Sequence, residues 1–176
     1  MNEMHPPPSW VVMGVSGSGK TEIARRLAAR LQLACIEGDD YHPPENIAKM
    51  SAGVALDDED RRAWLLLLQH KLREAADAGL SVVLACSALK RRYRDVLRGG
   101  NPDLIFLFLD GDRALLASRM QQRRGHFMPS AMLDGQLAAL EPPQADERFL
   151  RLDIQLTPDQ IVERIVAFHA TLHTGE

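Results

Sequence analysis

Short apolar runs alternate along the chain with longer stretches whose apolar residues recur at helical spacing. The runs contain no alternation of polar and apolar residues, which is typical of strands covered on both faces. They lie at residues 10–13, 34–36, 81–85, 104–109 and 150–154. This alternation of strand and helix predicts an α/β fold built on a parallel sheet.

The helical stretches between these runs have recognisable faces and ends. Residues 20–33 carry isoleucine and leucine every four positions, and residues 58–78 begin within a cluster of acidic residues suited to the positive end of a helix dipole. The last helix begins at Thr157, with Pro158 in the first turn and Gln160 as a capping-box partner. Because these crossovers are long enough to cover both faces, we predict a three-layer sandwich with a doubly wound sheet.

Length and composition restrict the class of protein further. The chain has 176 residues, 45% of them hydrophobic, without an internal repeat, which is typical of one globular domain. We expect this domain to occupy residues 10–176, after a flexible segment 1–9 in which three successive prolines prevent a helix. The formal charge of −3 offers no excess of positive charge for nucleic-acid binding, so we expect no nucleic-acid partner.

No targeting signal is recognisable in the sequence. Residues 1–9 lack both the positive charge and the apolar stretch of an export signal, and the longest apolar runs are far shorter than the ~20 residues that cross a bilayer. Cys35 and Cys86 each lie in an apolar run and are interpreted as reduced thiols. We therefore expect a cytoplasmic protein without a membrane partner.

A phosphate-binding motif lies between the first predicted strand and the first predicted helix. Residues 14–21 fit G-x-x-x-x-G-K-[ST], and the flanking elements favour a phosphate-binding loop (P-loop) over an ordinary glycine-rich turn. In such a loop the backbone N–H groups bind phosphate oxygens, the lysine contacts the β and γ phosphates, and the threonine hydroxyl reaches Mg²⁺. The sequence therefore predicts ATP and Mg²⁺ as cofactors, bound by Gly14, Val15, Ser16, Gly17, Ser18, Gly19, Lys20 and Thr21.

Two other classes of P-loop protein are disfavoured. The chain contains neither N-K-x-D nor D-x-x-G, the strings that GTPase switches need. The third predicted strand ends in Cys86-Ser87 instead of the aspartate of motor ATPases. A small-molecule kinase fits the sequence better.

Asp39 follows the second predicted strand and is the candidate catalytic base. A carboxylate at the carboxyl edge of the sheet can accept the proton of an attacking hydroxyl and hold Mg²⁺ through water. The competing interpretation is that Asp39 serves as a helix cap or turn residue. We interpret its neighbours Glu37 and Asp40 as solvated.

Three cationic residues favour an anionic acceptor. The predicted topology brings Arg61, Lys90 and Arg94 to the same edge of the sheet, where they could grip a carboxylate. The alternative is a solvated basic helix face. His42 and His126 have no second histidine or cysteine at metal spacing, so we expect them to form hydrogen bonds at the acceptor site instead of binding zinc.

Residues 119–141 break the regular rhythm and are expected to form a helical lid. Arg119 and Arg123 are four residues apart and so share a helix face, from which they could clamp ATP. In this interpretation Arg123 is catalytic, because it neutralises charge on the transferring phosphoryl group. The competing interpretation is a surface cluster that supports the helix dipole.

Several strings together resemble the gluconate kinase (gluconokinase) family, whose fold is similar to that of shikimate and adenylate kinases. They span residues 10–147 and include the P-loop, residues 38–43, 56–61 and 82–90, and Arg123-x-Gly125-His126-Phe127. The resemblance implies ATP-dependent phosphorylation of D-gluconate at its 6-hydroxyl and a homodimer. It also implies Asp39 at the acceptor, Arg61, Lys90 and Arg94 as gluconate contacts, and Arg123 in the lid.

The chain departs from the family pattern in small ways, and two alternative functions remain. Ala63, Gly135 and Leu137 stand where the family usually has Pro, Ser and Phe, so no charged group is lost. One alternative is a kinase for another anionic acceptor, such as shikimate, a nucleoside monophosphate or adenylylsulfate. Shikimate kinases carry a Gly-Gly-Gly run where this chain has residues 85–87, Ala-Cys-Ser, which argues against shikimate. The other is a non-catalytic nucleotide-binding regulator, which Asp39 and the lid arginines argue against.

Overall fold

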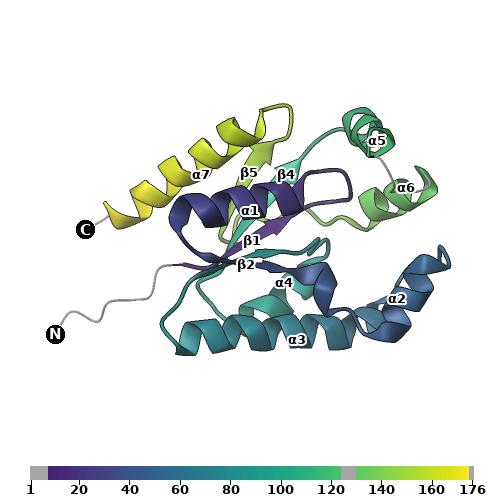
Figure 1. Cartoon of the computed structure of the whole chain (residues 1–176), viewed down its shortest axis with the longest axis horizontal. Helices are drawn as coiled ribbons and strands as arrows, with labels where there is room; N and C mark the ends of the chain where they lie inside the picture. Colours follow the sequence, from purple (N-terminus) through teal and green to yellow (C-terminus); the bar gives the residue numbers. More distant parts are fainter. Residues whose placement is uncertain (1–7, 124–129, 175–176) are drawn as a thin grey trace.

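A computed structural model of the chain describes residues 8–123 and 130–174, in which five parallel strands form one sheet. The strand order is β2-β3-β1-β4-β5 (Figure 1). The strands are β1 (Trp10–Met13), β2 (Ala34–Glu37), β3 (Val82–Ala85), β4 (Ile105–Asp110) and β5 (Phe149–Asp153). β1 lies in the centre, with β3 and β2 on one side and β4 and β5 on the other, and all neighbouring strands are parallel, so the predicted doubly wound parallel sheet is confirmed.

Helices cover both faces of this sheet. In Figure 1, α1 and α7 lie on one face and α3 and α4 on the other, while α2, α5 and α6 lie beyond the carboxyl ends of the strands. The helices are α1 (Lys20–Leu31), α2 (Pro44–Ser51), α3 (Asp58–Asp77), α4 (Arg91–Arg98), α5 (Arg113–Gln121), α6 (Ser130–Ala139) and α7 (Pro158–His173), with a 3₁₀ turn η1 at Gly38–Tyr41. The predicted three-layer sandwich is therefore confirmed. No described helix has the length and apolar character needed to span a bilayer.

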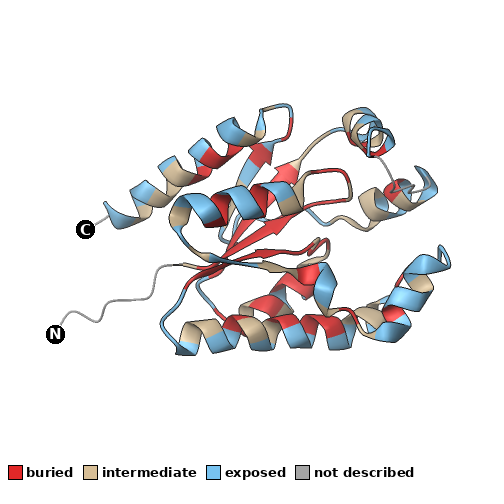
Figure 2. Ribbon diagram, in the orientation of Figure 1, coloured by how far each residue is buried: buried red, intermediate tan, exposed pale blue. Residues whose placement is uncertain are grey.

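Alternate residues of the central strand β1 belong to two different cores. Trp10 and Val12 pack with α1 and α7, whereas Val11 and Met13 pack with α3 and α4. Figure 2 shows the resulting buried residues along the strands and on the inward sides of the helices. Both faces need apolar side chains, which explains why the strand sequences do not alternate.

The ends of the elements follow local signals closely. Thr157 and Gln160 form the predicted capping box of α7, and Asp57 and Asp60 form a second one at the start of α3. The short helix α2 was not indicated by the sequence pattern. Ser9, which we placed in the flexible segment, is fully buried and bonds to both β3 and the residue that starts β4, so ordered structure begins before residue 10.

A buried ion pair joins α4 to the segment that precedes β5. Arg94 is fully buried, and its Nε and Nη2 atoms lie 2.7 and 3.1 Å from the carboxylate oxygens of Glu147. Arg94 Nη1 also donates to the carbonyl oxygens of Ala88, at 2.9 Å, and Leu89, at 3.2 Å. The pair therefore holds the loop between β3 and α4 against the segment that follows α6.

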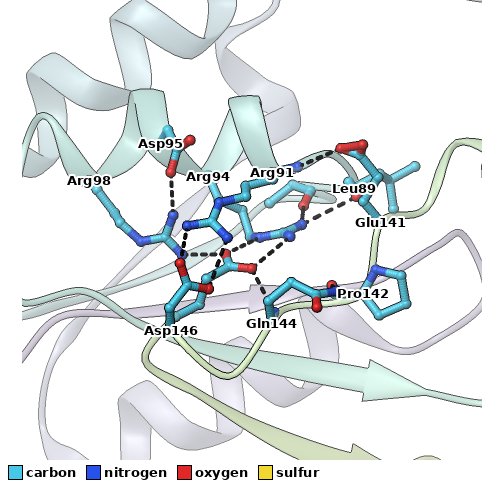
Figure 3. A network of polar contacts seen from close by, with 11 residues as sticks. Leu89, Arg91, Arg94, Asp95, Arg98, Glu141, Pro142, Gln144 and Asp146 are labelled. Carbon is cyan, nitrogen blue, oxygen red and sulfur yellow. Dashed lines mark hydrogen bonds and ion pairs between the residues drawn. The ribbon is translucent and has the colours of Figure 1, made fainter.

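Further hydrogen bonds fix the same loop (Figure 3). Glu141 receives a bond from the Arg91 backbone at 3.0 Å and donates its own backbone N–H to the Leu89 carbonyl at 2.8 Å. Ala88 is held in the left-handed region at φ 46°, which a non-glycine residue adopts only when its surroundings require it. The position of Lys90, the next residue but one, thus depends on contacts from outside its own loop.

The charge state of Glu147 depends on this network. Burial by itself would raise the pKa of Glu147, but hydrogen bonds from Arg94, the Gln144 backbone and Arg98 lower it to about 2. The carboxylate is therefore ionised in the folded protein at all ordinary pH values.

We predict that Glu147→Gln lowers the free energy of unfolding by about 3 kcal/mol, because it leaves the buried charge of Arg94 without a counter-ion. The neighbouring pair of Asp146 with Arg91, whose shorter contact is 2.6 Å, is exposed, so Asp146→Asn is the matched control and should cost less than about 1 kcal/mol. Urea denaturation at pH 7 measures both. If both variants lost the same amount of unfolding free energy, the greater contribution assigned to the buried Arg94–Glu147 pair would be contradicted.

The same comparison has a predicted pH dependence. The pKa of Glu147 is about 2 in the folded protein against an ordinary value of 4.5, so its stabilising effect is complete above pH 4.5 and is lost as the pH falls toward 2. The difference in unfolding free energy between the native protein and Glu147→Gln should shrink over that range.

Candidate active site

The P-loop connects β1 to α1 and has the shape that its glycines permit. Gly17 adopts φ 83°, and a Cβ atom there would lie 2.9 Å from Cγ of Met120 and 3.0 Å from the Leu116 carbonyl oxygen. A larger residue would therefore push α5 away from the loop. The N-cap of α1, Gly19, contributes no side-chain cap, which leaves the first N–H groups of the helix free for an anion.

The side chain of Lys20 folds back onto the P-loop. Its Nζ atom donates to the Val15 carbonyl oxygen at 3.1 Å, and Ser18 Oγ donates to the same oxygen at 2.7 Å. Burial lowers the pKa of Lys20, while the nearby carboxylates of Asp39 and Glu37 oppose that shift. A lysine in this position can turn toward a phosphate without leaving its place on the helix.

Part of the predicted P-loop and one predicted acceptor residue, Asp39, line one cleft of about 340 Å³. The cleft brings Lys20, Thr21, Asp39 and Arg123 together, as the topology predicted. Its full lining is Ser16, Gly17, Gly19, Lys20, Thr21, Glu37, Asp39, Ala85, Cys86, Ser87, Met120 and Arg123. Burial raises the pKa of the Cys86 thiol to about 12, so this cysteine is an inert wall of the cleft.

The structure corrects the interpretation of Glu37 as a solvated residue. Glu37 Oε2 accepts a hydrogen bond from Thr21 Oγ1 at 2.7 Å, inside the cleft. Its position as the last residue of β2, at the carboxyl end of a parallel strand, is the signal that could have indicated this. Thr21, Glu37 and Asp39 thus all contribute oxygen atoms to the lining of the cleft.

These oxygens fit Mg²⁺ bound together with a nucleotide. Among the described residues no group of three His, Cys, Asp or Glu side chains could hold a metal on its own. Mg²⁺ keeps several waters and is typically bound by one or two protein oxygens together with substrate phosphates. The donor set around Thr21 matches that requirement.

A second cleft of about 220 Å³ lies on the other side of the P-loop. Its apolar wall consists of Ile23, Leu156, Pro158 and Ile161. Arg119 lines it and donates to the carbonyl oxygen of Ile154. Arg123 lines both clefts and so stands between them.

The helix α6 is attached directly to the P-loop. Gln136 Oε1 accepts the backbone N–H of Ser16 at 2.7 Å, and Gln136 Nε2 donates to Ser16 Oγ at 3.0 Å. Gln136 is not among the site residues predicted from the sequence. A single glutamine 120 positions from its partner leaves no local pattern that could have revealed it.

Arg61 and Lys90 lie together around the ring of Tyr93. Their charged groups are 5.5 and 5.7 Å from its centroid, and Arg61 Nη1 is 3.2 Å from the Tyr93 hydroxyl. Asp58 is the counter-ion: it accepts from that hydroxyl and lies 3.3 Å from Lys90 Nζ. The hydrogen bond from Tyr93, together with Lys90 and Arg92, lowers the pKa of Asp58.

Two other predicted acceptor residues have different outcomes. Arg94 is fully buried and its Nε and both terminal nitrogens already bond to Glu147 and to backbone carbonyls, so it does not face the cleft. The sequence could not separate it from Lys90, since both belong to the same basic stretch. His126 lies outside the described residues, as do positions 124–129 in general.

His42 lies beside Asp39 but is almost completely buried. Its Nε2 atom is 3.8 Å from Asp39 Oδ1, and the ring stacks on Trp64 with 4.2 Å between centroids. Burial lowers the pKa of His42, Asp39 opposes the shift and Arg61 adds to it.

Comparisons with known proteins agree with this arrangement. A family model described as an AAA domain matches residues 10–143. The chain is 48% identical over 160 residues to a gluconokinase of Gluconobacter oxydans, covering 91% of this chain and 90% of that protein. It is 50% identical over 147 residues to the thermosensitive gluconokinase of Escherichia coli, covering 83% of this chain and 79% of that protein.

Solved structures give the same result. A gluconokinase from Sinorhizobium meliloti superposes with a TM-score of 0.87 at 46% identity, covering 96% of this chain and 94% of that chain. The APS kinase of Mycobacterium tuberculosis, at 18% identity and a TM-score of 0.65, covering 92% of this chain and 97% of that chain, shares the fold alone. With relatives of this identity along most of its length, the chain belongs to the gluconokinase family.

Proposed function

We propose that this protein transfers the γ-phosphoryl group of ATP to the 6-hydroxyl of D-gluconate, giving 6-phospho-D-gluconate. The observation that carries the proposal is the cleft in which the P-loop, Asp39 and Arg123 meet, in a chain that belongs to the gluconokinase family. Phosphoryl transfer needs positioning and charge neutralisation more than covalent chemistry, and these residues supply both.

ATP is proposed to span the two clefts on either side of the P-loop. The loop amides and Lys20 hold the phosphates, and the apolar wall with Arg119 receives the base. Thr21 is proposed to bind Mg²⁺ directly and Asp39 through water, with Glu37 nearby to accept from Thr21 or from a bound water. Held there, Mg²⁺ would neutralise part of the negative charge on the phosphates of ATP.

Gluconate is proposed to bind with its carboxylate among the cations around Tyr93. Arg61 and Lys90 are retained for this role, and His126 remains a proposed further contact. Arg94 is not retained, because its nitrogen atoms serve the buried ion pair with Glu147. Asp39 then accepts the proton of the attacking hydroxyl, and Arg123 stabilises the charge on the transferring group.

The alternative functions have weaker support. The curated relatives that cover about nine-tenths of this chain are named gluconokinases, whereas shikimate kinase and APS kinase structures share only 13% and 18% of residues with it. A non-catalytic regulator would not need a carboxylate and an arginine facing the P-loop lysine across one cleft. We further propose that residues 10–176 form one domain with a lid at about residues 119–141. The protein is proposed to be a homodimer in the cytoplasm.

We predict that the purified protein with Mg²⁺ and ATP releases ADP when offered gluconate, at about 1 to 100 s⁻¹. Glucose is the matched control, because it keeps the 6-hydroxyl but lacks the carboxylate; shikimate, AMP and a reaction without acceptor complete the series. Coupled spectrophotometric detection of ADP measures all five. Turnover with another acceptor, or none with gluconate, would contradict the proposal.

Lys20→Ala should reduce turnover at least about 100-fold, because it removes the charge that contacts the transferring phosphate. The melting temperature should stay close to that of the native protein, since the side chain makes only one hydrogen bond within the loop. Lys71→Ala, at a half-buried lysine of α3 paired with Glu74, is the control and should keep full activity. Near-normal turnover of Lys20→Ala would remove the P-loop from catalysis.

Asp39→Asn should lower kcat about 100-fold or more, while the dissociation constant for ATP changes little. The amide keeps the size of the side chain but is too weak a base to accept the hydroxyl proton. Asp40→Asn, at the exposed neighbouring position, serves as the control and should leave kcat unchanged. If Asp39→Asn turned over at the native rate, Asp39 would not be the base.

A further inference from the structure

The turn that carries Asp39 is anchored from behind by one tryptophan. Trp64 Nε1 donates to the Gly38 carbonyl oxygen at 2.7 Å, just before Asp39. The same indole stacks on the ring of His42, just after the turn, with an angle of 18° between the two planes. Both ends of the turn are therefore held by α3, while the side chain of Asp39 itself remains 80% exposed.

The contacts of Asn46 determine which way its amide faces. Asn46 is buried, and its Nδ2 atom lies 2.8 Å from the backbone carbonyl oxygen of Asp60. A carbonyl oxygen only accepts hydrogen bonds, so the nitrogen of the amide, and not its oxygen, must occupy this position. The second hydrogen of the same NH₂ group is left for another acceptor.

That acceptor is Nδ1 of His42, 3.3 Å from Asn46 Nδ2. A ring nitrogen that receives an N–H must present its lone pair, so Nδ1 carries no proton and the proton of the neutral ring sits on Nε2. Nε2 is the atom that faces Asp39 Oδ1, 3.8 Å away. The contact with Asn46 on α2 thus leaves the N–H of His42 on Nε2, the ring atom that faces the Asp39 carboxylate.

We propose that His42 is a positioning residue for Asp39, whose carboxylate it orients with an Nε2–H donor in a tautomer imposed by Asn46. The inference rests on the proposed function, in which Asp39 is the base. An exposed aspartate samples several rotamers, and a fixed hydrogen-bond donor beside it favours one of them. In this proposal the favoured rotamer is the one that faces the hydroxyl of gluconate. The 3.8 Å separation is longer than a hydrogen bond, so this role requires the Asp39 side chain to rotate slightly toward Nε2. In this role His42 does not touch gluconate, which differs from its expected place among the substrate contacts.

Kinetics of two variants test this role. His42→Phe keeps a ring for Trp64 and removes the donor, so kcat should fall about tenfold while the KM values for gluconate and ATP change less than about threefold. His42→Gln should recover part of the loss, because its amide N–H reaches about as far as Nε2. His70→Phe, at an exposed position on α3, is the matched control and should keep native kinetics. Melting temperatures confirm that all three variants are folded at the assay temperature.

Two kinetic outcomes would overturn the proposal. An unchanged kcat for His42→Phe would show that Asp39 needs no such donor. A raised KM for gluconate with unchanged kcat would show that His42 contacts the substrate directly.

The tautomer is tested separately, on the full-length native protein. A nitrogen-15 NMR spectrum of the histidine rings distinguishes a protonated from a bare ring nitrogen, and the spectrum of His42→Gln identifies the signals of His42. We expect Nε2 protonated and Nδ1 bare at pH 7.5; the opposite tautomer would overturn the proposal.

Failure of this inference differs from failure of the proposed function. If Asp39→Asn kept full turnover, the base assignment would fail, and the positioning role with it, although the tautomer could still be as expected. If Asp39→Asn were inactive while His42→Phe kept native kinetics, only the positioning role would fail.

Discussion

The parallel direction of all five strands is the constraint on which the site depends. In a parallel sheet, every loop that leaves the carboxyl end of a strand opens at the same edge. The P-loop after β1, the turn with Asp39 after β2 and the loop toward Lys90 after β3 therefore meet, although long stretches of chain separate them. The long crossovers that parallel pairing requires also supply the helices that bury both faces of the sheet.

Two of the proposed catalytic side chains are exposed, whereas polar side chains that hold the loops of the site are buried. Asp39 and Arg123 are open to solvent, whereas the side chains that hold their surroundings, such as Trp64, Asn46 and Arg94, are buried and hydrogen-bonded. A buried charge such as that of Arg94 destabilises the fold unless it is matched, and Glu147 with two backbone carbonyls matches it. These buried polar side chains thus hold loops that are too short to form stabilising contacts of their own.

The helices beyond the sheet edge are attached to the P-loop from two directions. Met120 of α5 lies against Gly17, and Gln136 of α6 bonds to Ser16. After α6, Glu141 bonds to the loop that leads to Lys90. The P-loop and the loop that leads to Lys90 are therefore connected through α6 as well as through the sheet, which suits the proposed reaction, in which two substrates must be aligned.

Much of this architecture follows from the sequence by itself. The strands, the P-loop and the capping box of α7 each depend on residues that are close together in the chain, so a local pattern suffices to predict them. The position of Asp39 could also be predicted, because a residue that follows a strand of a parallel sheet lies at the edge where the carboxyl ends of the strands meet. The choice of gluconate came from strings that resemble a known family.

Only the tertiary structure decided which polar side chains face the cleft and which support it from behind. Lys90 and Arg94 lie four residues apart in one basic stretch, yet one flanks Tyr93 and the other is buried against Glu147. Glu37 and Gln136 gained their roles from Thr21 and Ser16, partners that the fold alone brings near. Hydrogen bonds between segments that are distant in the chain depend on how those segments pack in three dimensions. Unlike the apolar face of a helix, such bonds produce no periodic pattern in the sequence.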